Sequence, residues 1–420
     1  MSTHPAPSRG VPWRACLVAF AAAFAVRLFF LSLVPEDALR PDPDWELDAI
    51  AITLATRGEF ADPYAVPTGP TAHLPPVPPL LLAGIVRLFG VSITAGIVAW
   101  LIGTLAQSAI WGMLPWIGQR VGLGWRAGLA GALAAAPFPQ WLLNHGEDIA
   151  AVTFGLLVVA AVRRWESRPR AGGSLLLGAG FGFLFHVQPA FLPVLLGYLA
   201  FELWMRSDRR RWRSAGLVVL GAVIVCLPWG VRNSRALDAV FFVRSNFGLE
   251  LRMGNHEGAT ASIETPHFRT DPQHPRALAS EAMKVREMGE VPYMRAAGRE
   301  ARAWIGQHPG QFAGLTAERF GYFWLGPLDR PAVALLFSAL TALAIFGAAR
   351  TLPTLPPHRI AALITPLLAY PPVYYLVPWQ QRYRFPIEWV LFLLAGAAVW
   401  SGHLRRAESE PREGEPVESR

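Results

Sequence analysis

The chain has 420 residues, of which 53% are hydrophobic and only 16% are charged, and its mean hydropathy is +0.31. A soluble domain usually carries about 25% charged residues, so the composition predicts a membrane protein. The formal charge of +8 does not indicate a nucleic-acid partner, because the arginines cluster between apolar segments without the interleaved aromatics of a nucleic-acid groove. Cys16 and Cys226 each lie in an apolar run and form no CxxC motif.

The apolar runs predict an all-α polytopic membrane protein with about ten spans. A span needs roughly 20 mainly apolar residues, and the candidates are 15–34, 93–117, 127–144, 148–162, 173–187, 189–205, 214–231, 331–349, 360–378 and 386–402. Two of these are short, so nine to eleven spans fit the pattern. The expected organisation is a cytoplasmic N-terminus at 1–14, a transmembrane domain at 15–403, and a polar, disordered cytoplasmic tail at 404–420.

The arginine distribution predicts the orientation in the membrane. With a cytoplasmic N-terminus, the arginine-rich turns at 163–170 and 206–213 fall inside, as does the C-terminus. The opposite side of the membrane, expected to be the inner membrane, then receives the outer loops 35–92 and 232–330. Unusual polar clusters gather on that face, which predicts a reaction or binding site at the outer membrane surface.

The first outer loop begins with an acidic stretch, PDPDWELDAIAITLATRGEF from Pro41. The pattern predicts a helix over 45–57, with Asp44 at its N-cap and with Asp44 and Asp48 on one face. Acids in a first turn suit the helix dipole, so a capping role is one interpretation. The other is catalysis, since partial desolvation at the lipid interface raises a carboxyl pKa toward that of a general base.

Several stretches resemble glycosyltransferase family 39, which includes the protein O-mannosyltransferases and the lipid A aminoarabinose transferases. After the acidic helix come GEFADPY and PTGPTAHLPPVPPLLLAGIVRLFG, the latter predicting a short interfacial helix over 73–90. LPWGVRNSRALDAVFFVRSNFGLELRMGNHEGA (227–259) and YRFPIEWVLFLLAG (383–396) are similar to later segments of the family. The resemblance implies a GT-C-like bundle with amphipathic helices in the first outer loop and a larger outer loop near 232–330.

The resemblance also implies an activity. Family members transfer a hexosyl or pentosyl group, with inversion, from a polyprenyl-phosphate donor to an acceptor hydroxyl or phosphate on a lipid, glycan or protein. An acid of the first outer loop serves as base, a role that falls to Asp44 or Glu46 here, with Asp48 as a further candidate. The family often shows an adjacent Asp-Glu pair, whereas Trp45 separates the two acids in this chain. We rank Glu46 first because it follows an aromatic residue and precedes IA at a spacing that resembles bacterial members of the family.

A second acidic pair occurs in NHGEDIAA (144–151). The family analogue of Glu147 and Asp148 orients the acceptor or a bound ion, whereas acids at a turn also serve as solvated groups or helix caps. His186, in FHVQP, is a weaker candidate, because a lone histidine is more often structural. No cofactor and no metal motif is indicated, and the participation of a divalent cation stays open.

Four outer-face arginines are candidates for the donor phosphate. A guanidinium binds phosphate with two parallel hydrogen bonds, and it stabilises the charge that develops on the leaving group. The alternative is interfacial snorkelling, which runs against the positive-inside bias on this face. The candidates are Arg232, Arg244, Arg382 and Arg384.

The long outer loop supplies further candidates. Asn246 and Asn255 flank the glycines of a turn-rich segment that could shape a substrate pocket or satisfy loop backbone. The stretch 260–312 predicts one or two amphipathic helices that cap the site, with Tyr293 positioned to meet substrate.

Two other functions compete with the glycosyltransferase. A transporter places charges near the bilayer midplane and often has two similar halves, whereas here the charges lie at one surface and no repeat is visible. An O-antigen ligase or polymerase shares the lipid-phosphate chemistry and stays open. The expected partners are the lipid-phosphate donor, its acceptor and membrane lipids, and the sequence leaves the sugar unnamed.

Overall fold

The computed structural model describes residues 10–138, 146–167, 169–263 and 274–409. Within these ranges the regular structure is helical, and the only β pairing is two isolated bridges, Ala61–Pro70 and Ser262–Trp379. This confirms the predicted all-α class. Most of the predicted tail at 404–420 lies outside the described residues, and the last helix continues to Ser409.

The predicted spans each contain helix, although not all are long enough to cross a membrane. Within the described ranges, five helical segments have the necessary length and apolar composition. Their helices are α1 (Trp13–Leu31), α4 (Ile93–Val121), α9 (Arg210–Leu237), α14 (Pro331–Thr351) and α17 (Phe385–Ser409). The remaining predicted spans hold α5 (Trp125–Ala135), α6 (Glu147–Glu166), α7 (Ala171–Phe185), α8 (Leu192–Met205), α15 (Pro357–Ala369) and α16 (Pro372–Tyr375). The count of ten spans is therefore not confirmed.

Proline explains one of the shorter elements. The predicted span 360–378 is divided into α15 and α16 around Pro371 and Pro372. Neither proline supplies a backbone N–H, so two successive helical hydrogen bonds are missing at this point and α15 ends before them.

Helix α17 forms the centre of the bundle. Its residues from Phe385 to Ala395 are buried on nearly all sides. Close approach by its neighbours depends on glycine: a Cβ at Gly347 would lie 1.9 Å from the Leu394 carbonyl oxygen, and one at Gly396 would lie 2.1 Å from that of Ala127. Small residues at helix contacts are typical of membrane bundles, where close packing replaces the hydrophobic effect between helices.

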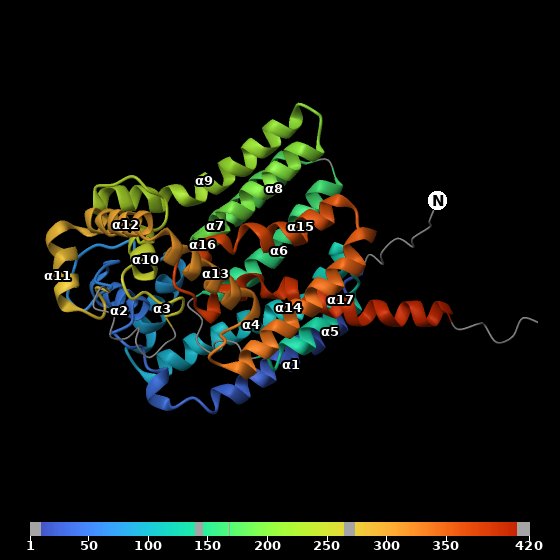
Figure 1. Ribbon diagram of the computed structural model, residues 1–420, viewed down its shortest axis with the longest axis horizontal. Helices are drawn as coiled ribbons and strands as arrows, with labels where there is room; N and C mark the ends of the chain where they lie inside the picture. Colours follow the sequence, from blue (N-terminus) through green and yellow to red (C-terminus); the bar gives the residue numbers. More distant parts are fainter. Residues whose placement is uncertain (1–9, 139–145, 168, 264–273, 410–420) are drawn as a thin grey trace, which may run out of the picture.

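The two predicted outer loops meet at one end of the bundle. The first contains η1 (Glu36–Leu39), α2 (Glu46–Arg57) and α3 (Val77–Phe89); the second contains α10 (Phe247–Gly254), α11 (Ala279–Met288), α12 (Glu290–Gln307) and α13 (Pro309–Leu325). In Figure 1, α2, α3, α10, α11 and α12 gather at the left, whereas α17 runs toward the opposite end. The Ser245 N–H donates to the Ala72 carbonyl oxygen over 3.1 Å, which joins the loops directly.

The start of α2 differs from the prediction. Its N-cap is Trp45, with no side-chain cap, so the prediction of Asp44 as N-cap is wrong. The reason is a tighter turn: the Asp44 N–H donates to Asp42 Oδ1 over 3.0 Å, and Asp48 Oδ2 accepts the Asp42 N–H over 2.8 Å. Asp48, in the first turn of α2, thereby reaches back to the entering chain, much as the acid of a capping box does. Asp44 lies before the helix and does not share a helical face with Asp48.

Candidate functional site

Charged and aromatic side chains from distant parts of the chain converge where the two predicted outer loops meet the bundle. We call this group the outer cluster. It comprises Glu46, Tyr64, His73, Glu147, Arg244, Glu250, His274, Arg276, Arg382 and Tyr383. Arg382 has electrostatic interactions with Glu147, Glu250 and Glu46, so acids from three separate helices face one cation.

Glu46 occupies the part of the cluster contributed by the first outer loop. Its Oε1 lies 3.3 Å from Arg276 Nε and 3.6 Å from His274 Nε2. Arg276 also stacks on the Trp45 ring, 4.4 Å from its centroid. Arg276 and His274 therefore fix the orientation of the Glu46 carboxylate, whereas Asp44 is exposed to solvent.

Asp48 lies deeper than the other acids of this stretch. Burial raises its pKa from 3.8 to about 6, although the hydrogen bond from the Asp42 N–H favours the charged form. At neutral pH the fold therefore bears the cost of a partly desolvated carboxylate.

That burial predicts a pH-dependent gain in stability for Asp48→Asn. Because the folded pKa exceeds the unfolded one, the carboxyl penalises folding as pH rises through the window from 3.8 to about 6. Each unit of pKa difference corresponds to about 1.4 kcal/mol, so we expect a gain of about 1–3 kcal/mol at pH 7. The gain should nearly vanish below pH 4. Thermal unfolding across pH measures it, and an equal gain at both pH values would contradict the assignment.

Arg382 and Glu147 form the opposite side of the cluster. Arg382 Nη1 lies 3.3 Å from Glu147 Oε1, and its Nε donates to Gln380 Oε1 over 2.6 Å. The Arg382 side chain keeps 23% of its surface exposed. The neighbouring Asp148 is buried and interacts with Arg27 of α1, so only the first acid of the predicted pair faces the cluster.

The structure separates the roles of the two loop arginines. Arg244 donates from Nε to the His73 carbonyl oxygen over 3.0 Å, lies 3.8 Å from Glu250, and keeps 25% of its side chain exposed. Arg232 instead donates to the carbonyl oxygens of Thr71 and Phe60 over 2.5 and 2.6 Å. Its guanidinium thus holds the first outer loop in place, and only Arg244 belongs to the cluster.

Arg384 does not join the outer cluster. Its side chain is fully buried, and Nε and Nη2 bind Glu388 Oε1 over 2.9 and 2.7 Å. The guanidinium also lies 3.8 Å from the centroid of the Phe337 ring. This residue stabilises the interior of the bundle in the structure.

Other predicted residues have structural contacts. Asn255 donates to the carbonyl oxygens of Leu251 and Leu376 over 2.7 and 2.8 Å, which is the backbone-satisfying role. His186 Nδ1 lies 2.7 Å from the Gly182 carbonyl oxygen. Asn246 is buried and donates to Glu250 over 2.8 Å, so it borders the cluster through that acid.

Sequence reasoning missed a histidine pair. His73 Nδ1 lies 2.9 Å from Tyr64 Oη, and the His274 ring lies 6.4 Å from both rings, centroid to centroid. Burial, followed by the charge of Arg244, holds the pKa of His73 well below its usual value, so its imidazole is neutral at pH 7. The polar start of the proline-rich segment was the available signal for His73, whereas nothing local indicated His274.

Glu290, at the start of α12, was also missed. Its buried carboxylate accepts hydrogen bonds from the Thr71 hydroxyl, from the Ala72 N–H over 2.8 Å, and from the Ser245 hydroxyl over 2.5 Å. Burial raises the pKa of this group. These bonds fix the loop segments that carry His73 and Arg244, so Glu290 positions both residues.

The acids of the cluster are paired with cations. Among the described residues, no group of three or more His, Cys, Asp or Glu side chains is arranged to hold a metal ion. Glu46 and Glu147 each lie against an arginine. The cluster in this arrangement therefore offers a mixed site of carboxylates and guanidiniums, and not a ring of oxygen ligands.

One segment of the chain matches the model of a known protein family. Residues 73–231 match the family model described as dolichyl-phosphate-mannose-protein mannosyltransferase. No curated protein matches the chain at the level of sequence.

Solved structures match over nearly the whole chain. The archaeal oligosaccharyltransferase AglB from Archaeoglobus fulgidus, in complex with an inhibitory peptide and a dolichol-phosphate, is 15% identical over 96% of this chain and 52% of its own, with a TM-score of 0.55. The Archaeoglobus fulgidus oligosaccharyltransferase complex with Zn and sulfate is 14% identical over 94% of this chain and 49% of its own, with a TM-score of 0.56. ArnT from Cupriavidus metallidurans bound to undecaprenyl phosphate is 14% identical over 95% of this chain and 80% of its own, with a TM-score of 0.38.

The chain spans about half the length of the archaeal oligosaccharyltransferases that it matches. At such low identity the likeness concerns the fold. The predicted resemblance is thereby confirmed: residues 73–231 match the model of the dolichyl-phosphate-mannose-protein mannosyltransferase family, and the chain has the fold of the GT-C membrane glycosyltransferases.

Proposed function

We propose that this protein is an integral membrane glycosyltransferase that moves a sugar from a polyprenyl-phosphate donor to an acceptor on the periplasmic face of the inner membrane. The observation that carries the proposal is the outer cluster. It brings an acid of the first outer loop, Glu46, into the electrostatic range of Arg382 near the start of the last helix. A carboxylate and a guanidinium at the membrane surface are the groups that an inverting transfer from a lipid phosphate needs.

The donor phosphate binds to the partly exposed guanidiniums of Arg382 and Arg244. Glu147 holds the first of these at 3.3 Å, and the His73 carbonyl oxygen holds the second at 3.0 Å. As the bond between the anomeric carbon and the phosphate oxygen breaks, negative charge grows on the leaving group. Fixed cations at that position lower the barrier directly.

Glu46 is the proposed base. The acceptor hydroxyl attacks the anomeric carbon from the face opposite the phosphate, and its proton passes to the Glu46 carboxylate. Arg276 and His274 orient this carboxylate. The products are the glycosylated acceptor and the free lipid phosphate, whose charge stays with the arginines.

The comparisons support a lipid-phosphate donor. An enzyme of the same fold is solved in complex with dolichol-phosphate, and the matched family model is named for dolichyl-phosphate-mannose. The comparisons do not identify the sugar or the acceptor of this chain, because the matched structures share only 14–15% of their residues with it.

The function is tested with purified protein in nanodiscs, a panel of labelled polyprenyl-phosphate hexoses and pentoses, and a membrane extract that supplies the acceptor hydroxyl. We expect release of lipid phosphate from one donor, and donor affinity reduced about tenfold to a hundredfold in Arg382→Ala, since a hydrogen bond to a charged group contributes about 1.5–3 kcal/mol. Arg295→Ala, an exposed arginine of α12, is the matched control. The double variant Arg382→Gln/Glu147→Gln separates lost binding from an unpaired Glu147. Equal donor affinity in all variants would remove Arg382 from the proposal.

The outer location is tested by labelling single cysteines in intact cells. In a Cys16→Ala/Cys226→Ala background, we expect a membrane-impermeant thiol reagent to label Arg299→Cys of α12, because the arginine distribution places this helix outside. Ser207→Cys, exposed in the arginine-rich turn after α8, should react only after lysis. Labelling of residue 207 and not residue 299 in intact cells would invert the topology.

A further inference from the structure

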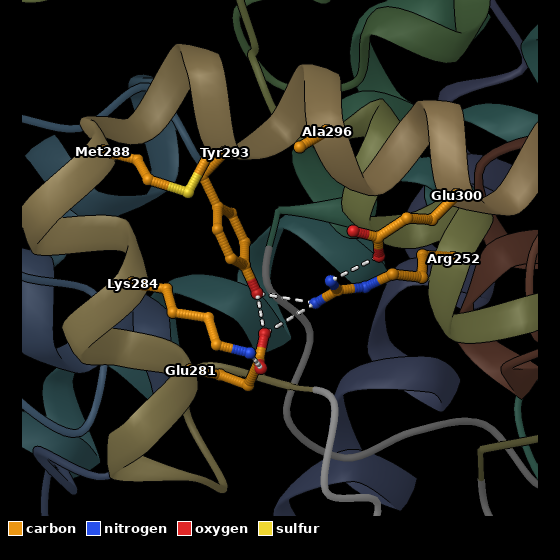
Figure 2. A pocket seen from close by; sticks show the side chains of 7 residues that line it. All are labelled: Arg252, Glu281, Lys284, Met288, Tyr293, Ala296 and Glu300. Atoms are coloured by element: carbon orange, nitrogen blue, oxygen red, sulfur yellow. Dashed lines mark hydrogen bonds and ion pairs between the residues drawn. The ribbon is translucent and has the colours of Figure 1, made fainter.

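A cavity of about 310 Å³ lies among α10, α11 and α12, within the second outer loop. Figure 2 shows Lys284 and Met288 on one side of it and Arg252 and Glu300 on the other, with Tyr293 between them. Ligand sites in proteins usually measure about 300–1,000 Å³, so this cavity suits one small ring and not an extended chain.

The floor of the cavity is polar and buried. Arg252 Nη2 lies 3.1 Å from Glu281 Oε2 and 2.6 Å from Tyr293 Oη, and that hydroxyl donates to Glu281 over 2.7 Å. All three residues are more than nine-tenths buried. Because apolar residues of similar volume would hold three helices together at least as well, stability alone does not account for this network beneath a cavity.

The rim offers unused hydrogen-bonding capacity. The side chains of Lys284 and Glu300 are 59% and 62% exposed. Lys284 Nζ contacts Glu281 at 2.5 Å, and Glu300 Oε2 contacts Arg252 Nη1 at 3.1 Å. An ammonium has three N–H donors and a carboxylate has about four acceptor sites, so both groups retain positions for a ligand. Met288 adds an apolar wall.

The charge balance selects the class of ligand. Two cations and two carboxylates line the cavity, and each is already in an ion pair with a member of the other set. An ionic ligand would bring an unbalanced charge into a lining whose cations and carboxylates already compensate one another. A sugar ring meets the same lining without that cost, because each hydroxyl both donates and accepts and the ring carbons present an apolar face.

The cavity adjoins the outer cluster. Tyr293 shares a buried apolar group with Tyr64, Leu249 and Met253. Tyr64 in turn contacts His73 through its hydroxyl and interacts electrostatically with Glu46. Tyr293 and Tyr64 therefore connect the cavity to the neighbourhood of the proposed base through one buried apolar group.

We infer that this cavity binds one neutral sugar ring of the acceptor, so that the acceptor is a carbohydrate and not a peptide. The assignment of this ring to the acceptor rests on the proposed function, whereas the binding of a sugar ring in the cavity does not depend on it. Lys284 and Glu300 hold adjacent hydroxyls, and the apolar face of the ring lies against Met288. The next unit of the glycan then extends toward Glu46.

The test is saturation-transfer NMR on the full chain in nanodiscs, with methyl glucoside, methyl mannoside, methyl galactoside and a serine-containing tripeptide as probes. We expect signal for at least one glycoside, and binding weakened about tenfold in Lys284→Met and in Glu300→Gln, because each loses a charge-assisted hydrogen bond. Both side chains are well exposed, so the fold should persist. Arg286→Met and Glu287→Gln, exposed on α11 and outside the cavity, are the matched controls and should bind like the wild type.

Three outcomes would overturn the inference: no glycoside signal in the wild type, equal glycoside binding in cavity and control variants, or tripeptide binding that Lys284→Met abolishes. Donor cleavage by the wild type is measured separately. Glycoside binding at this cavity without donor cleavage would refute the proposed function and retain the sugar site. Donor cleavage without glycoside binding would refute the sugar site and retain the proposed function.

Discussion

Glu46→Gln should abolish sugar transfer while leaving donor binding almost intact. The amide keeps the shape of the side chain and can still lie against Arg276 and His274, whose guanidinium and ring nitrogens are 3.3 and 3.6 Å from the present carboxylate. It cannot take up the proton of the acceptor hydroxyl at neutral pH. A general base contributes about 10²–10⁴-fold to the rate, so an endpoint assay with labelled donor will show the loss.

Two neighbouring acids provide the controls for this experiment. Asp44 is exposed ahead of α2, and Asp48 is engaged with the Asp42 N–H, so Asp44→Asn and Asp48→Asn should both retain transfer. Loss of transfer in Asp44→Asn with normal rates in Glu46→Gln would move the base to Asp44. Normal rates in all three variants would remove the acidic stretch from the mechanism.

The architecture was predictable because it depends on composition. Apolar runs locate each helix of the bundle, and prolines at the start of 73–90 locate α3, which begins at Val77. The arginine bias predicted that 35–92 and 232–330 share one face. Labelled helices of both segments, α2, α3, α10, α11 and α12, gather at one end of the bundle (Figure 1), and the side of the membrane that this end faces stays a prediction. These signals are local: the apolar and arginine patterns act through the energy of placing a residue in lipid, and the prolines act through backbone geometry.

The composition of the site was less predictable, because it depends on which way a side chain points. Arg382 and Arg384 stand two residues apart in η5 (Gln381–Arg384), yet the first faces Glu147 in the outer cluster and the second faces Glu388 inside the bundle. Before the structure, the two arginines were equivalent candidates. Contacts between residues far apart in the chain, such as Glu46 with Arg276, leave no local trace in the sequence.

Arg384→Ala is expected to cost stability and not donor affinity. Its guanidinium is fully buried against Glu388, at 2.7 Å. Removing one partner of a buried pair leaves an uncompensated charge and typically costs about 3–5 kcal/mol. Because that is a large fraction of the stability of an ordinary domain, we expect a sharp fall in the unfolding temperature and in the yield of purified protein.

A double variant separates the structural role of Arg384 from a direct role at the donor. Replacing both partners, in Arg384→Met/Glu388→Leu, removes the charges together, and apolar side chains of similar volume often restore or improve stability in such sites. Donor affinity in this folded variant should equal that of the wild type, because the guanidinium has no exposed surface through which to reach a phosphate. A tenfold or greater loss of donor affinity despite restored folding would show that Arg384 contacts the donor, and that the arrangement of η5 changes when the donor binds.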